Sequence, residues 1–79
     1  MTGNDETTSV KAIEMVRRLN HKLAQQCHAR GITVEDVAMA SLFTTFDIAQ
    51  SFSGDQGAVE WLRTGADLIE RQLMEGTRQ

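Results

Sequence analysis

The sequence predicts an all-α protein, a compact arrangement of three helices near residues 9–30, 34–52 and 55–75 that oligomerisation would complete. Proline is absent from the 79 residues, and amino acids that favour helices are common. Apolar residues recur at spacings of three and four, and no segment shows the alternation with a period of two that is typical of a strand. Gly31 and Gly54 follow the first two periodic segments, where a helix commonly ends.

The first helix, 9–30, is predicted to begin at Thr8 or Ser9, because either side chain can accept hydrogen bonds from free backbone N–H groups. Asn20 falls inside the apolar arc of this helix. Two interpretations remain open: Asn20 fixes register or oligomeric state in an interface, or it lies at the edge of the arc with its amide in water. The arc spans about 140° of the helical wheel. Its members are Ala12, Ile13, Val16, Leu19, Leu23, Ala24 and Cys27.

The second helix, 34–52, has the clearest start signal in the chain. Thr33 is the predicted N-cap, and Asp36 three residues later gives a variant of the capping box. Ile32 and Val37 flank the cap as a hydrophobic staple. Apolar residues cover about 240° of this helix, so it should be covered on more than one side.

The third helix, 55–75, is predicted to be capped by Ser53 or Asp55 and to end at Gly76. Gly65 stands in its middle, where glycine costs up to about 1 kcal/mol relative to alanine. The close approach of a helix or a large side chain would explain this glycine; the alternative is that nothing approaches the position. The connections between helices are short, which predicts neighbouring, roughly antiparallel helices.

We expect a single helical domain over residues 9–76, between a flexible acidic N-terminus, 1–8, and a frayed end, 77–79. A domain of this size buries a modest core, and Cys27, the single cysteine, cannot form an internal disulfide. A partner chain is the remaining source of buried area. No segment resembles a signal peptide or is long and apolar enough to span a bilayer, so the expected location is the cytoplasm.

Catalytic, metal and cofactor sites are not expected. His21 and His28 share a face but lie about 10 Å apart along the helix, too far for one tetrahedral ion with Cys27. Cys27 lies in the apolar arc, where a free thiol behaves as a small hydrophobe. The carboxylates lie on polar faces or at helix starts, away from the pockets that shift a catalytic pKa. The sequence therefore predicts a protein that is not an enzyme.

Charge is distributed unevenly along the chain, whose net charge is −3. Residues 9–31 carry five basic residues against one acid, whereas residues 32–79 carry eight acids against three arginines. The basic arc of the first helix could bind a polyanion or an acidic partner through Lys11, Arg17, Arg18, His21 and Lys22. No aromatic residue interleaves with this arc to stack on bases, so tight nucleic-acid binding is not expected. A polyanion-binding accessory protein is the alternative function.

The favoured function is non-enzymatic association, either with a second copy as a homodimer or with another protein. The wide apolar arc of the second helix exceeds what two neighbouring helices can cover, and large bare apolar patches usually mark interfaces. Aromatic residues and methionine are enriched at interface centres. The predicted centre is Met39, Phe43, Phe46, Trp61 and Leu68.

Overall fold

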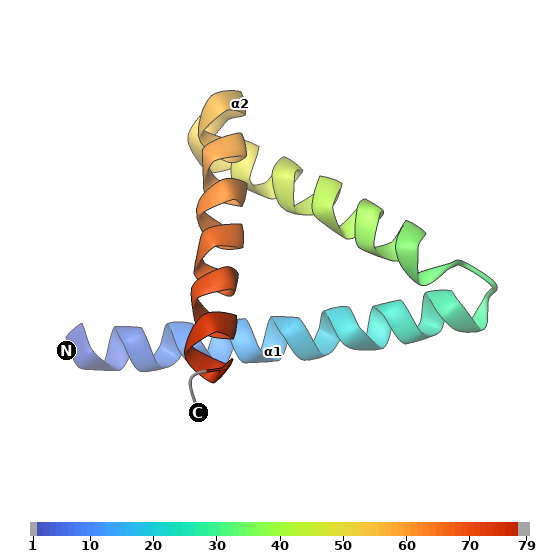
Figure 1. The fold of residues 1–79 in the computed structure, drawn as a ribbon, viewed down its shortest axis with the longest axis horizontal. Helices are drawn as coiled ribbons and strands as arrows, with labels where there is room; N and C mark the ends of the chain where they lie inside the picture. The colour runs from blue at the N-terminus through green and yellow to red at the C-terminus, as the bar shows by residue number, and fades with distance from the viewer. Residues whose placement is uncertain (1, 78–79) are drawn as a thin grey trace. The chain divides into compact units, whose positions relative to one another are not determined.

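The computed structural model describes the backbone of residues 2–77 and the side chains of residues 8–76. Its two elements are the helices α1 (Thr2–Ala29) and α2 (Val34–Thr77), so the all-α prediction is confirmed (Figure 1). The chain divides into two compact units, Met1–Ala38 and Met39–Gln79. That residues 9–76 form one domain stays a prediction.

The structure corrects the predicted helix boundaries and does not show a compact arrangement of three separate helices. Helix α1 begins at Thr2 instead of residue 9. No proline interrupts the segment that precedes residue 9, so the backbone can continue as a helix. The predicted helices 34–52 and 55–75 are two parts of α2, because only Gly54 departs from helical geometry between them. We call residues 34–53 the first arm of α2 and residues 55–77 its second arm.

The end of α1 is a Schellman motif built on Gly31. This residue has a φ of 87°, in the left-handed region that glycine adopts without steric cost. The N–H of Ile32 donates to the carbonyl of Cys27 at 3.1 Å, and the N–H of Gly31 donates to the carbonyl of His28 at 2.9 Å. These two bonds satisfy carbonyls that the end of a helix would otherwise leave without a partner. The predicted glycine stop is confirmed.

The start of α2 is the predicted cap at Thr33. The hydroxyl oxygen of Thr33 accepts the backbone N–H of Asp36 at 3.1 Å, which is the N-cap hydrogen bond. The carbonyl of the same residue accepts the N–H of Val37 at 3.1 Å and begins the helical ladder. Acidic Glu35 and Asp36 occupy the first turn, where they complement the helix dipole.

Substitutions in this turn should destabilise the helices that it joins. We expect Thr33→Ala to cost about 1 kcal/mol, because the Asp36 N–H loses its acceptor. Gly31→Val should cost at least as much, because a β-branched residue resists positive φ. Thermal unfolding followed by circular dichroism measures both effects, with Thr44→Ala at an exposed helical position as the control. Unchanged midpoints for both variants would contradict this account of the turn.

The bend of α2 is made by Gly54, which has φ 73° and ψ −179°. This combination lies in a region of backbone space that is essentially restricted to glycine. Ser53 and Asp55, the two expected caps of the second arm, both form hydrogen bonds with earlier residues of the first arm. The hydroxyl of Ser53 donates to the carbonyl of Ala49 at 2.8 Å, and Nε2 of Gln50 donates to Oδ1 of Asp55. Gly54 itself thus occupies the non-helical position that precedes the second arm.

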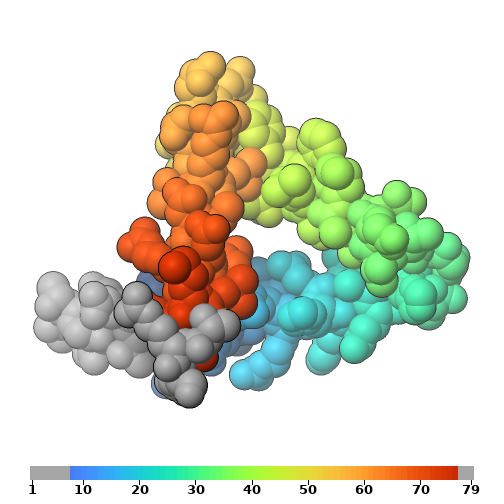
Figure 2. Space-filling view, viewed as in Figure 1, coloured from blue at the N-terminus to red at the C-terminus, as the bar shows by residue number. Residues whose placement is uncertain are grey.

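The two arms pack closely next to this bend, where their atoms touch in the space-filling view (Figure 2). Ala49 before the bend and Ala58 after it are 1% and 0% exposed, and they form the buried core of the described residues. Phe52 and Trp61 meet edge to face, with ring centroids 6.1 Å apart and an interplanar angle of 80°. The small alanine side chains therefore let the backbones of the two arms approach closely, and the Phe52–Trp61 pair packs beside them.

Two glycines of the second arm lie in opposite environments. A Cβ atom at Gly57 would lie 2.8 Å from the Cβ of Ser53, closer than two such carbons can approach. A Cβ at Gly65 would have no neighbour within 4 Å. The close approach considered for Gly65 on sequence grounds is therefore not present in the described residues, and Gly57 is a second glycine, besides Gly54, that the bend requires.

Matched alanine substitutions at these glycines should have opposite effects on stability. Gly57→Ala should destabilise the bend, because overpacking against Ser53 costs about 1–3 kcal/mol, more than the gain in helix propensity. Gly65→Ala should stabilise the helix by up to about 1 kcal/mol, because alanine loses less backbone entropy there. Chemical denaturation of the two variants beside the parent chain measures both, and effects of equal sign would contradict the geometry.

Candidate association surface

The apolar face of α1 is bare within its own unit. Ile13, Val16, Leu19 and Leu23 are each more than half exposed, although their spacing is that of a buried helix face. In this unit α1 is accompanied only by the turn and the first residues of α2, which are too few to cover it. Cys27, near the turn, is half-buried and free. About three turns of α1 thus present an apolar stripe that no other described residues of this unit cover.

The interface centre predicted from the sequence contains no residue of this stripe. In the predicted arrangement of three helices, the apolar arc of α1 packs inside the chain. Helical periodicity has the same form whether a face packs inside the chain or against a partner. The apolar arc was therefore visible in the sequence, but no signal distinguished the two uses. Asn20 lies exposed on the same face of α1.

The first arm of α2 carries apolar residues on both sides of its contact with the second arm. Ala49 marks the contact. Met39 and Phe43 lie on one side and are 55% and 63% exposed, whereas Ile48 and Phe52 lie on the other and are 60% and 62% exposed. On a wheel of 100° per residue the two pairs are about 180° apart. We call Met39 and Phe43 the Phe43 edge, and Ile48 and Phe52 the Ile48 edge.

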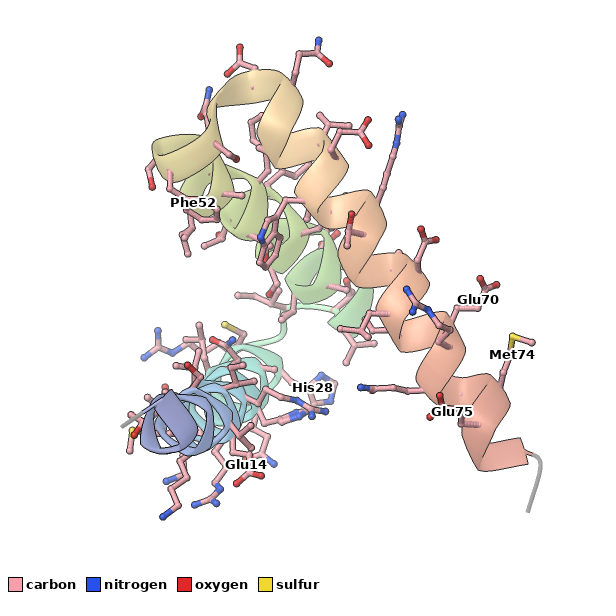
Figure 3. All side chains as sticks on the ribbon, turned by 90° about the vertical axis from the view of Figure 1, so that its left-hand side faces the viewer. Glu14, His28, Phe52, Glu70, Met74 and Glu75 are labelled. Carbon is pink, nitrogen blue, oxygen red and sulfur yellow. The ribbon has the colours of Figure 1, made fainter. Side chains whose placement is uncertain are left out.

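The second arm continues as an apolar stripe beyond the bend. Trp61 and Leu68, two turns apart, are each 51% exposed. Ile69 and Leu73 are exposed as well, farther from the bend. Acidic side chains border this stripe, and two of them, Glu70 and Glu75, are labelled on the second arm in Figure 3.

The predicted interface centre is divided between the two arms. Met39 and Phe43 lie one turn apart on the Phe43 edge, and Phe46, one turn further, is half-buried. Trp61 and Leu68 lie on the second arm, and Trp61 contacts Phe52 in its own unit. That ring contact was not visible from separate helical wheels, because the bend alone determines which residues of the two arms meet. The use of these five residues in an interface stays a prediction.

The predicted basic arc lies on α1, with all five members exposed: Lys11, Arg17, Arg18, His21 and Lys22. Arg17, Arg18 and His21 also line a shallow, open hollow together with Glu14. The carboxylate of Glu14 places a negative charge among these cations, which weakens the attraction of a bare anion. The hollow is formed by side chains of one helix and is open to solvent.

Within the described part of the chain, no three side chains of the types that ligate metals lie together. No helix among the described residues is long and apolar enough to cross a bilayer.

The exposed apolar faces of α1 and of both arms of α2 are thus the chemically distinctive feature of the described chain. Large bare apolar faces are uncommon on soluble monomers, and they usually mark interaction sites. Comparisons of the chain with protein-family models, with curated proteins and with solved structures find no match.

Proposed function

We propose that this chain acts by association through its apolar helical faces, and that its partner is a second copy of itself. Association, rather than catalysis, is the activity that exposed apolar faces support. The observation that carries the proposal is the pair of opposite apolar edges on the first arm of α2. A twofold dimer is the commonest solution, because one self-complementary surface is then used twice.

The opposite position of the two edges limits what one chain can bury by itself. The second arm already occupies the face between the Phe43 edge and the Ile48 edge, around Ala49. A single further helix that packed on the first arm could contact one of these edges but not both, since they are about 180° apart. At least one apolar edge would therefore remain for another chain.

The energetic gain from covering such an edge is substantial. Burial of one large apolar side chain contributes about 1.5–3 kcal/mol, and a twofold interface counts each residue twice. Chains of this size bury a small core alone, and the described residues contain just two fully buried side chains, both of alanine. Self-association supplies the missing buried area without a disulfide or a metal.

The test is the molar mass of the purified chain as a function of concentration, by sedimentation equilibrium or light scattering. We expect a mass of twice 8.8 kDa that falls to the monomer value on dilution. A chain that stays monomeric at about 100 µM would have a dimerisation free energy weaker than about −5.5 kcal/mol, and the proposal would then be wrong.

A further inference from the structure

We infer, on the basis of the self-association proposed above, that the apolar face of α1 in one copy packs on the second arm of α2 in the other copy. In a twofold dimer this contact occurs twice. The α1 face of each copy is then covered by the second arm of the other copy, which is apolar along one stripe and acidic along its borders.

The two stripes match in length and in apolar character. The exposed apolar residues of α1 run from Val10 to Leu23, and those of the second arm run from Trp61 to Leu73. At 1.5 Å per residue each stripe is about 20 Å long. The α1 stripe has branched aliphatic side chains at intervals of three and four, and the second arm has Leu62, Ile69 and Leu73 on one face at intervals of seven and four. Both spacings form ridges that can pack into grooves.

The borders of the two stripes carry opposite charge. On the α1 wheel Arg17 and Lys22 border the apolar stripe on its two sides, and both are exposed. On the second arm the equivalent positions are held by Glu70 and Glu75, which are also exposed. Opposite charges at the rim of an apolar contact steer the encounter and exclude partners of the wrong sign.

Charge also decides against the pairing of α1 with α1. Residues 9–31 carry five basic residues against one acid, so two copies of α1 side by side would bring like charges together. The second arm has the complementary balance. Glu60 forms a 3.2 Å ion pair with Arg63, and beyond this pair residues 64–76 carry three acids against one arginine.

A charge-swap experiment on the full chain tests this contact. The basic-reversed variant is Arg17→Glu with Lys22→Glu, and the acid-reversed variant is Glu70→Lys with Glu75→Lys. We expect each variant alone to dimerise at least about tenfold more weakly than the parent chain, and an equimolar mixture of the two to recover most of the loss as a heterodimer. Native mass spectrometry resolves the heterodimer, and sedimentation gives the dissociation constants.

A matched control separates the local contact from the overall charge. Arg18→Glu changes the net charge by the same amount as Arg17→Glu alone, but about 100° further round α1 and away from the apolar stripe. We expect this control to dimerise within about threefold of the parent chain, because exposed charges farther away than a Debye length of about 8 Å are screened at physiological salt.

Each other outcome overturns the inference in a recognisable way. If the mixture stays monomeric while a single chain with all four reversals regains the parent stability, the second arm of the same chain covers α1. If the basic-reversed variant forms heterodimers with the parent chain more tightly than the parent dimerises, α1 pairs with α1. If dimers persist unchanged in every variant, the charged borders make no contact, although self-association itself stands. A parent chain that is monomeric at about 100 µM refutes the proposed function instead.

Discussion

Gly54→Ala should straighten α2 into a continuous helix. At φ 73° and ψ −179° an alanine side chain is strained by about 1–3 kcal/mol. In a straight helix, alanine is instead favoured over glycine by about 1 kcal/mol. The two effects add, so the substitution should shift the balance between bent and straight α2 by about 2–4 kcal/mol, or roughly 30-fold to 1,000-fold. One residue can have this effect because the helix is interrupted at Gly54 alone.

The change is measured as a distance between the arms. Spin labels at the exposed positions Thr44 and Thr64, in a Cys27→Ala background, report the separation of the two arms. In a continuous helix these backbone positions are about 30 Å apart. We expect the alanine variant to move the distance distribution toward this value from a shorter one.

Two controls isolate the backbone as the cause. Gly65→Ala adds the same methyl group to the same helix, α2, at a position with open space, and it should leave the distance unchanged. D-Alanine at position 54, introduced by chemical synthesis, has the mirror-image preferences of an ordinary residue. The backbone angles of Gly54 are the mirror image of φ −73° and ψ 179°, which lie in the extended region that L-residues favour. D-Alanine should therefore adopt the angles of Gly54 without strain and keep the bend. Straightening by both alanine isomers would show that backbone strain is not what makes Gly54 necessary.

Phe43→Glu should reduce self-association by about 100-fold or more when the Phe43 edge lies in the dimer interface. The side chain is 63% exposed in the free chain, so the substitution should leave the folding of the unit within about 0.5 kcal/mol of the parent. In an interface centre, the introduced carboxylate would lose its water without gaining a partner, which costs several kcal/mol. Sedimentation measures the dissociation constant, and circular dichroism measures folding.

Neighbouring substitutions show which edge is used. Thr44→Glu places the same charge on the polar side of the same turn and should leave the mass unchanged. Ile48→Glu places it on the opposite apolar edge. Loss of the dimer in Ile48→Glu alone would move the interface to that edge and refute the predicted centre. Trp61→Glu is a poorer probe, because it also removes the ring contact with Phe52 and so weakens the bend.

The turn between α1 and α2 could be predicted from sequence because its determinants are local. Gly31 and Thr33 act through hydrogen bonds to residues at most five positions away. Such bonds depend on the backbone preferences of the residues that form them, and not on distant packing. The start of α1 was less predictable, because Thr8 and Ser9 resemble caps although the preceding acidic residues can also extend the helix.

The sequence by itself determined the helical class, the Gly31 stop, the Thr33 cap and the existence of apolar faces, because propensity, capping and periodicity are properties of neighbouring residues. Only the tertiary structure decided that Gly54 forms a one-residue bend, that Gly57 lies against Ser53, and that Phe52 meets Trp61. It also decided that the α1 face is left bare within its own unit. These features depend on how two helical segments are rotated about a bend. A periodic apolar pattern cannot specify that rotation, because the pattern is the same whichever neighbour covers it.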